Sequence, residues 1–297
     1  MAARAALGEC AALVRRHDPH YLCAALLPPE AAGAAGPGAR AKAFALRAFA
    51  VEVRLAARRK ETLALMRLAW WRDAVHKAYR GQAPDHPVAR ALGALCAAGD
   101  GPTRLSKGWF TRIVSQREKV AAGEAVQADL DALEAFAEGT ASSLLYLQLE
   151  AAGVKDPAAH HAASHLGKAA GLSLLLRGTV EHVQRKELYL PQDLCREHGV
   201  DVEALYRGEV GDGLNEVVWR VASRAKVHLD EARALAAGVP AGAVPLLWPA
   251  IPVSHHLSAL EANAFNPLTE AMLTEDRGVS ALRLNADFAW KRLWNKY

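Results

Sequence analysis

The sequence predicts an all-α fold, and three observations carry this prediction. Alanine is abundant along the whole chain, and alanine has the highest helix propensity of all residues. Runs in which valine, isoleucine or threonine alternate with polar residues, the usual pattern of a β-strand, are scarce. Several long stretches instead repeat apolar residues every three to four positions, as one face of a helix does.

The length and composition limit the domain organisation. A chain of 297 residues can form one large domain or two small ones. Because no internal repeat or low-complexity block is present, we expect a single domain over residues 1–297. Hydrophobic residues make up 52% of the chain, yet no apolar run approaches the roughly 20 residues that a membrane-spanning helix needs. The composition therefore predicts a soluble globular protein.

The charge and the cysteines exclude few function classes. The chain has 36 Lys and Arg residues against 32 Asp and Glu residues, a net charge of +4. A charge this small permits contact with an anionic surface or a nucleic acid but argues for neither. The four cysteines, Cys10, Cys23, Cys96 and Cys195, are widely spaced and suggest neither a zinc site nor a disulfide framework.

The first 32 residues combine features of a targeting peptide with those of a folded helix. Arg4, Arg15 and Arg16, with few acidic residues, are typical of a mitochondrial targeting peptide. The apolar pattern continues without a break, however, so we expect most of this segment to belong to the folded protein. The Gly- and Pro-containing segment 31–40 is expected to form a flexible loop.

Two helices are predicted between residues 41 and 80. Apolar residues such as Phe44, Leu46 and Phe49 recur at helical spacing in the first, and the second runs from Leu63 to Tyr79. The adjacent residues Trp70 and Trp71 point about 100° apart on a helix. We therefore expect one of them in the core and the other against a neighbouring helix.

A stretch from 171 to 199 is the most informative part of the chain. Its helical pattern runs to about Lys186, and Pro191 then predicts a turn that opens a short new helix. Arg177, Glu181 and Arg185 are spaced four apart, so they lie on one side of the helix. From the residues alone this face is either a solvated Arg–Glu–Arg ladder or the lining of a cavity, because unpaired buried charge is very costly.

Two further groups of polar and aromatic residues remain ambiguous. His161 and His165 have the spacing of metal ligands on a helix, but the HExxH pattern is absent, and we expect these residues and His160 to be exposed. A basic aromatic tail at about 285–297 contains Trp290 and Trp294. Such a tail folds onto the body, binds a partner or contacts a membrane surface, and the sequence does not separate these alternatives.

The run LLLRGTVEHVQRKELYLPQDL resembles the second motif of the squalene/phytoene synthase family, which reads roughly N-x-x-R-D-x-x-E-D, then a basic pair and Y-L-P-x-D. In that family the carboxylates of the motif hold magnesium ions that bind an isoprenoid diphosphate, and Mg²⁺ does prefer such oxygen ligands. Arg177 and the segment 189–193 fit the motif. Gly178 and His182, however, stand where the first and last Asp belong, so only the carboxylate of Glu181 remains.

The other Asp-rich motif of that family reads A-L-x-x-F-x-x-x-x-D-D-x-x-D. Ala45, Leu46 and Phe49 fit it, but our alignment places Arg54, Leu55 and Arg58 at its three Asp positions. Two guanidinium groups would repel a divalent cation, and arginine stays charged at every relevant pH. The alternative is that Arg54 and Arg58 face solvent and line no site.

One branch of the family resembles this chain at these altered positions. Its members act as assembly factors for mitochondrial respiratory complex I, the NADH dehydrogenase assembly factor 6 group. Their pattern is close to L-R-x-T-x-x-H-x-x-R-x-x-x-L-P-x-D-x-C-x-x-H-G-V. The residues that fit it are Leu176, Arg177, Thr179, His182, Arg185, Leu190, Pro191, Asp193, Cys195, His198, Gly199 and Val200. The group's L-R-A-F-x-V-E also matches residues 46–52.

The resemblance implies a single isoprenoid-synthase-like helical bundle around a central cavity. It also implies a mitochondrial location, in the matrix or at the periphery of the inner membrane, and protein partners in complex I or its assembly intermediates. We expect a pseudoenzyme that acts by binding, with no catalytic residue, metal or cofactor. The former metal positions are Arg54, Leu55, Arg58, Gly178, Glu181 and His182.

A ligand and two other functions stay open at this point. Candidate residues for lining the cavity or binding an anion are Arg54, Arg58, Arg177, Arg185 and Tyr189. Such a cavity could hold an isoprenoid, a quinone or a phospholipid. The first alternative function is an active head-to-head prenyltransferase, which needs more carboxylates than the alignment provides. The second is a structural subunit of a large mitochondrial assembly, a ribonucleoprotein included, so nucleic acid stays open as a partner.

Overall fold

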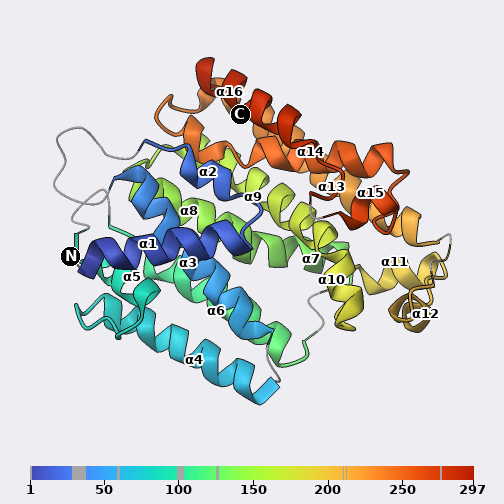
Figure 1. Cartoon of the computed structure of the whole chain (residues 1–297), viewed down its shortest axis with the longest axis horizontal. Coiled ribbons are helices and arrows are strands. Elements are labelled where there is room, and N and C mark those ends of the chain that lie inside the picture. The colour runs from blue at the N-terminus through green and yellow to red at the C-terminus, as the bar shows by residue number, and fades with distance from the viewer. Residues whose placement is uncertain are drawn as a thin grey trace. The chain divides into compact units, whose positions relative to one another are not determined.

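Every regular element in the described part of the chain is a helix, which confirms the all-α prediction (Figure 1). The computed structural model describes residues 2–28, 38–58, 61–98, 104–124, 127–209, 211, 213–274 and 276–297. The helices are α1 (Ala2–His17), α2 (Tyr21–Ala25), α3 (Ala39–Ala57), α4 (Glu61–Ala78), α5 (Pro87–Ala98), α6 (Lys107–Ala121), α7 (Leu130–Ala137), the π-helix η2 (Glu138–Ser142), α8 (Ser143–Ala151), α9 (Pro157–Arg177), α10 (Thr179–Gln184), α11 (Gln192–Glu197), α12 (Val202–Tyr206), α13 (Gly213–Ala234), the short 3-10 helices η3 (Leu235–Gly238) and η4 (Val244–Leu247), α14 (Ala250–Ala262), α15 (Glu270–Leu273) and α16 (Ala281–Leu293). Among these residues, none of the helices is both long and apolar enough to cross a bilayer.

The chain folds into two compact units. Unit 1 comprises Met1–Glu124, Ser143–His160 and Gly238–Leu246, and unit 2 comprises Ala125–Ser142, His161–Ala237 and Leu247–Tyr297. Neither unit is one continuous segment, because the chain passes between them inside helical runs, after Ser142 and after His160. The prediction of a single domain, like that of a central cavity, stays a prediction.

Helix α3 forms the centre of the unit 1 core. Helices α1, α4, α5, α6 and α8 all pack against it. The ring of Phe49 makes edge contacts with those of Trp71 and Phe110, with centroid distances of 5.7 and 5.2 Å. Trp71 is buried and Trp70 is partly exposed beside it and His86. The prediction that one tryptophan lies in the core is therefore confirmed, for Trp71. Trp70 was expected to pack against a neighbouring helix, but it contacts His86, which lies in a loop.

A buried ion pair joins the start of the chain to α3. Arg47 Nη1 donates to Asp18 Oδ2 at 2.8 Å, and the backbone N–H of His20 donates to Asp18 Oδ1 at 2.8 Å. The exposed fractions of the two charged side chains are only 5% and 12%. Burial raises the pKa of the Asp18 carboxyl, but the charge and hydrogen bond of Arg47 outweigh burial and lower it. The pair explains why an arginine interrupts the apolar face of this helix.

In unit 2, helix α9 lies unusually close to the α7–η2 segment. A Cβ atom placed on Gly167 would lie 2.3 Å from Ser142 Cα, and one on Gly171 would lie 2.5 Å from Ala137 Cβ. The hydroxyl of Ser142 donates to the carbonyl oxygen of Ser164 at 3.0 Å. Glycine and serine thus allow backbone-to-backbone packing here, and the chain accommodates it with a π-helical turn.

The C-terminal segment is a helix that packs on unit 2. Phe288 of α16 is buried, and the hydroxyl of Tyr297 donates to the carbonyl oxygen of Ala232 in α13 at 2.8 Å. His255 Nε2 of α14 lies 3.2 Å from Asp287 Oδ2. Of the three alternatives for this tail, folding onto the body is therefore realised, although it leaves the outer face of the helix available.

Two predicted boundaries need correction. The predicted loop at 31–40 lies mostly outside the described residues, but Ala39 and Arg40 already belong to α3. The long helix predicted to reach Lys186 breaks at Gly178, which separates α9 from α10. Lys186 itself has a left-handed backbone (φ 57°) that ends this helical run.

Candidate functional site

The residues of the two altered motifs belong to different units. Arg54 and Leu55 lie in the last turn of α3, and Arg58 follows it, in unit 1. Gly178, between α9 and α10, and the first turn of α10 belong to unit 2. That the two motifs line one shared cavity therefore stays a prediction.

In unit 1, the former aspartate positions form a basic neighbourhood at the end of α1. Arg54 Nη2 donates to the carbonyl oxygen of His17, one of the last carbonyls of α1. Burial lowers the pKa of His17, and the charges of Arg16, Arg54 and Arg58 lower it further. Arg54 is half-buried and has a structural role, so the alternative that it simply faces solvent does not hold. A divalent cation would be repelled here.

In unit 2, the imidazole of His182 fills the space beside Gly178. A Cβ atom placed on Gly178 would lie 2.6 Å from His182 Cε1 and 2.8 Å from its Nε2. Atoms at such distances overlap, so no side chain fits at 178 while His182 keeps its position. The residues at two of the three predicted carboxylate positions are thus linked, because His182 occupies the space that a side chain at 178 would need.

The histidine continues into a stack of aromatic rings. The centroids of the His182 and Tyr189 rings are 4.6 Å apart, and those of Tyr189 and Phe136 are 6.2 Å apart. His182 is buried, and Tyr189 is half-buried. Tyr189, a candidate for lining a cavity, therefore packs between α7 and α10 within unit 2.

The one carboxylate that remains, Glu181, is paired with Arg277. The buried guanidinium of Arg277 donates to the carboxylate of Glu181 and to the carbonyl oxygens of Met272 (3.2 Å), Leu273 (3.1 Å) and Thr274 (2.8 Å). Its Nε also donates to the carbonyl oxygen of Arg177 at 3.3 Å. The positive charge of Arg277 beside this carboxylate would oppose the binding of a metal ion there.

The two other basic residues of this face differ in their environment. Arg177 Nη1 donates to the carbonyl oxygen of Asp276 at 3.3 Å, so it also contacts the turn that carries Arg277. Arg185 is exposed at the C-terminal end of α10. The turn around Arg277 was missed by the sequence analysis, because it matches no motif and lies about a hundred residues further along the chain.

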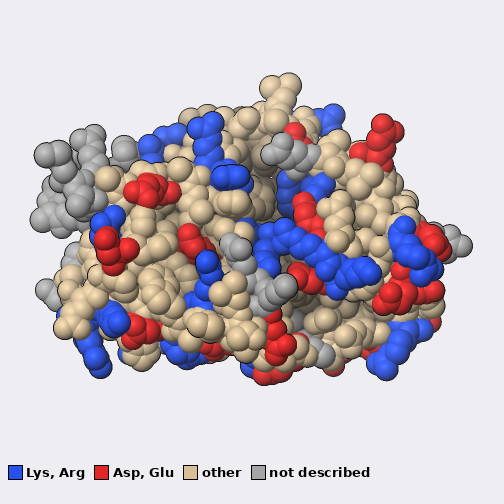
Figure 2. All heavy atoms as spheres, turned by 60° about the horizontal axis from the view of Figure 1, so that its bottom comes forward, with Lys and Arg blue, Asp and Glu red and all other residues tan. Residues whose placement is uncertain are grey.

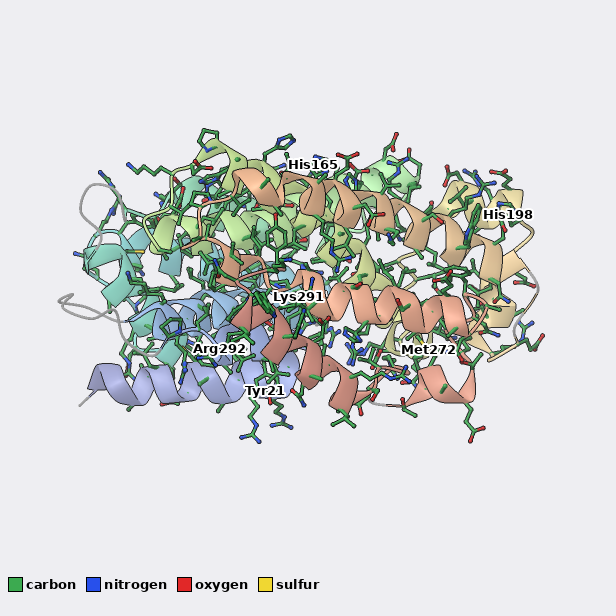
Figure 3. The ribbon with its side chains drawn as sticks, turned by 90° about the horizontal axis from the view of Figure 1, so that it is seen from above. Tyr21, His165, His198, Met272, Lys291 and Arg292 are labelled. Atoms are coloured by element: carbon green, nitrogen blue, oxygen red, sulfur yellow. The ribbon has the colours of Figure 1, made fainter. Side chains whose placement is uncertain are left out.

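A second cluster of titratable groups lies on α9 in unit 2 (His165 is labelled in Figure 3). His165 Nε2 lies 3.3 Å from His161 Nε2, and His165 Nδ1 lies 3.1 Å from His228 Nδ1 of α13. His228 Nε2 in turn lies 3.1 Å from Glu134 Oε2 of α7. His161 is exposed as predicted, whereas His160 and His165 are half-buried. Within the described ranges, no group of three or more His, Cys, Asp or Glu residues is arranged to hold a metal ion.

The environment of this histidine cluster shifts two pKa values. Burial lowers the pKa of His165, and the neighbouring His228 and His161 lower it further. Burial raises the pKa of Glu134, but His228 and Arg224 outweigh burial and lower it to about 2. Both shifts have the same consequence, because each group binds protons more weakly in the folded chain than in the unfolded chain.

Stability is therefore expected to fall as the pH falls. The part due to His165 is lost below pH 6.5, the ordinary pKa of imidazole, and the part due to Glu134 is lost between pH 4.5 and about 2. Urea unfolding at a series of pH values measures this dependence. His165→Gln should flatten the curve between pH 7 and 5, and Glu134→Gln should flatten it below pH 4.5. His160→Gln on the same helix is the matched control, and an equal flattening in that variant would contradict the assignment.

A second expected result concerns the space beside Gly178. Gly178→Ala should lower the free energy of unfolding by about 1–3 kcal/mol, because the new methyl group overlaps the imidazole of His182. In a His182→Ala background the same change should cost much less, and urea unfolding of the four variants gives the coupling. Gly108→Ala, a helical glycine with open space, is the control. Additive effects of the two substitutions would contradict the overlap.

The family model of squalene/phytoene synthase matches residues 14–283. The solved squalene synthase HpnC from Alicyclobacillus acidocaldarius has a TM-score of 0.73 at 19% identity and covers 90% of this chain and 97% of its own. A dehydrosqualene synthase solved in complex with ligand has a TM-score of 0.75 at 18% identity, with 98% of each chain covered. These structures establish the fold.

A protein of Rattus norvegicus, named NADH dehydrogenase (ubiquinone) complex I, assembly factor 6, is 37% identical over 260 residues, which is 86% of this chain and 74% of that protein. The resemblance to this group, which the residues around Arg177 and Arg47 carry, is thereby confirmed. Because the family model spans most of the sequence and the solved synthases share its helical fold, the chain belongs to the squalene/phytoene synthase family.

Proposed function

We propose that this protein takes part in the assembly of mitochondrial respiratory complex I and that it acts by binding, without catalysis. The first part is supported by the similarity to relatives that are named complex I assembly factor 6. The proposal places the protein in the mitochondrial matrix or at the periphery of the inner membrane. Its partners are then subunits of complex I or their assembly intermediates.

The observation that carries the second part is the state of the Glu181 carboxylate. A synthase of this family needs carboxylates that are free to bind Mg²⁺ and, through it, a diphosphate. Here Glu181 is paired with the buried Arg277, and the imidazole of His182 occupies the space that an aspartate at 178 would need. The other motif carries Arg54 and Arg58, which would repel the metal.

The basic residues at these positions also support a ligand with an anionic group. The candidates for binding the anionic group of a lipid or an isoprenoid are Arg54 and Arg58 in unit 1 and, separately, Arg177, Arg185 and Tyr189 in unit 2. Native mass spectrometry of the purified protein should then detect such a molecule. A protein that carries no bound lipid, and whose motif residues only pack against side chains, would contradict this part of the proposal.

Purification of the tagged full chain from mitochondria tests the assembly role. Complex I subunits should be enriched among the co-purifying proteins, and deletion of the gene should reduce assembled complex I on native gels. Re-expression of Glu181→Gln, after its solubility and unfolding have been checked, should restore complex I because no metal-dependent step is involved. The assembly role would be wrong if complex I were unchanged by the deletion. Failure of Glu181→Gln alone would instead favour catalysis.

A further inference from the structure

The outward face of α16 carries large apolar side chains in an unusual concentration. Leu282, Trp290, Leu293 and Trp294 are 81%, 59%, 74% and 56% exposed, and we call these four residues the α16 stripe. At about 100° per residue they fall within an arc of about 120° on one side of the helix. Phe288, which is buried, points to the opposite side. Contiguous exposed apolar residues of this size mark an interaction surface.

The stripe belongs to a helix that is already fixed on its inner side. Phe288 is buried against unit 2, Asp287 lies 3.2 Å from His255, and the Tyr297 hydroxyl donates to the carbonyl oxygen of Ala232. The helix begins with a side-chain cap, in which Ser280 accepts from the backbone N–H of Arg283. The four exposed residues are therefore held on one side of a helix whose other side is packed.

The surroundings of the stripe are strongly basic. The segment 281–297 contains Arg283, Lys291, Arg292 and Lys296 but only one acidic residue, Asp287, which is engaged with His255. Lys291 and Arg292 are labelled on this helix in Figure 3. Burial lowers the pKa of Lys291, and the nearby charges of Arg233 and Lys296 lower it further. Several cations thus lie close together, and an anionic partner would relieve their repulsion.

Elsewhere on unit 2 the basic side chains have acidic partners on the same surface. Arg207 pairs with Glu209, Arg220 with Glu216, and Lys226 with Asp230. Figure 2 shows basic and acidic side chains next to one another over much of the face that it draws, and a continuous run of basic side chains near its centre. The segment 281–297 differs from these surfaces, because it has four basic residues and one acidic residue.

We propose that the α16 stripe docks the protein onto the surface of a bilayer that contains anionic phospholipids. An interfacial helix of this kind lies in the plane of the membrane, with its apolar residues among the headgroups and its basic residues against the phosphates. Tryptophan favours this depth because its ring is apolar and its N–H is polar. Tryptophan and arginine are also common in protein–protein interfaces, whereas lysine is depleted there. The excess of basic over acidic residues around the stripe is therefore what favours an anionic lipid surface. This inference deepens the proposed location at the periphery of the inner membrane, and vesicle binding tests it separately from the role in complex I.

Vesicle flotation with the full-length protein tests the proposal. The protein should float with vesicles of phosphatidylcholine mixed with phosphatidylglycerol. Its affinity for vesicles of phosphatidylcholine alone should be lower by a factor of about ten or more. Binding should weaken as salt is added, because salt screens the contact between the basic residues and the phosphates. Insertion of Trp290 and Trp294 should also shift the tryptophan emission to shorter wavelengths.

Two pairs of variants separate the contributions of the stripe and of its charges. Leu282→Gln with Leu293→Gln should abolish flotation, whereas Val227→Gln, which changes a 56% exposed apolar residue of α13, should not affect it. Arg292→Glu with Lys296→Glu should remove the preference for anionic vesicles. The matched charge control is Arg207→Glu with Lys226→Glu, which changes the net charge equally and should leave flotation intact.

Three results would overturn the proposal. The first is a wild-type protein that stays in the soluble fraction with anionic vesicles, in which case a protein covers the stripe. The second is a Leu282→Gln/Leu293→Gln variant that floats as well as the wild type. The third is a stable dimer in solution, measured by light scattering, that the same variant dissociates, because the stripe would then be a contact between two copies of the chain.

Discussion

Replacing Asp18 with alanine is expected to lower the free energy of unfolding by about 3–5 kcal/mol, because it leaves the guanidinium of Arg47 charged and without its partner in the interior of unit 1. Arginine cannot escape this penalty by losing its proton. The two charged atoms are 2.8 Å apart, and both side chains are almost completely buried. Urea unfolding followed by circular dichroism measures the loss.

Two variants make this prediction specific. Asp18→Ala combined with Arg47→Met should be more stable than Asp18→Ala alone, because the stranded charge is removed and apolar packing replaces it. Asp73→Ala breaks an ion pair of exposed residues with Lys77, and it should cost less than about 1 kcal/mol. An Asp18→Ala variant no less stable than Asp73→Ala would contradict the importance of the buried pair.

Gly167→Ala is expected to have the second large effect, a loss of about 3 kcal/mol in the free energy of unfolding. The added methyl group would lie 2.3 Å from Ser142 Cα and 2.6 Å from Ser142 Cβ. Because the first of these atoms belongs to the backbone, relief requires α9 and η2 to move apart, and a side-chain rotation does not suffice. Thermal or urea unfolding measures the loss.

The control for this substitution is a helical glycine with open space around it. Gly8 lies inside α1, and a Cβ atom added there meets no atom within 4 Å. Gly8→Ala should therefore raise the free energy of unfolding by about 0.5–1 kcal/mol, the ordinary gain in helix propensity. If the substitutions at 8 and 167 changed stability in the same direction, the close approach of α9 to η2 would be wrong.

The helices were predictable from the sequence because their signals are local. The apolar spacing around Phe49 and the aromatic pair at Trp70 and Trp71 give α3 and α4 directly. The break at Gly178 and the π-helical turn before Ser143 were not predictable in the same way. The contact at Gly178 is local, with the imidazole of His182 four residues further on, but no periodic pattern marks it. The π-helical turn packs against the backbone of α9, which the fold brings close to it.

In the candidate site, too, sequence motifs suggest positions for individual residues but do not reveal the contacts between distant segments. The assignment of Gly178, Glu181 and His182 to lost or retained carboxylate positions rests on the sequence motif and stays a prediction. The sequence could not reveal Arg277 as the partner of Glu181, or His228 as the link between His165 and Glu134, because these contacts join segments far apart in the chain. Pairing across such distances depends on the packing of whole helices and leaves no periodic pattern in the sequence.

The central claim is that the motif has lost the ability to hold magnesium and diphosphate, and incubation with farnesyl or geranylgeranyl diphosphate in the presence of Mg²⁺ tests it most directly. A squalene synthase assayed in parallel serves as the positive control. The account predicts that the purified full-length protein yields no more condensed product than a reaction without protein. Product formed in proportion to the amount of protein would contradict the account, because Glu181 and the neighbouring residues would then support a metal-dependent reaction despite Arg277 and His182.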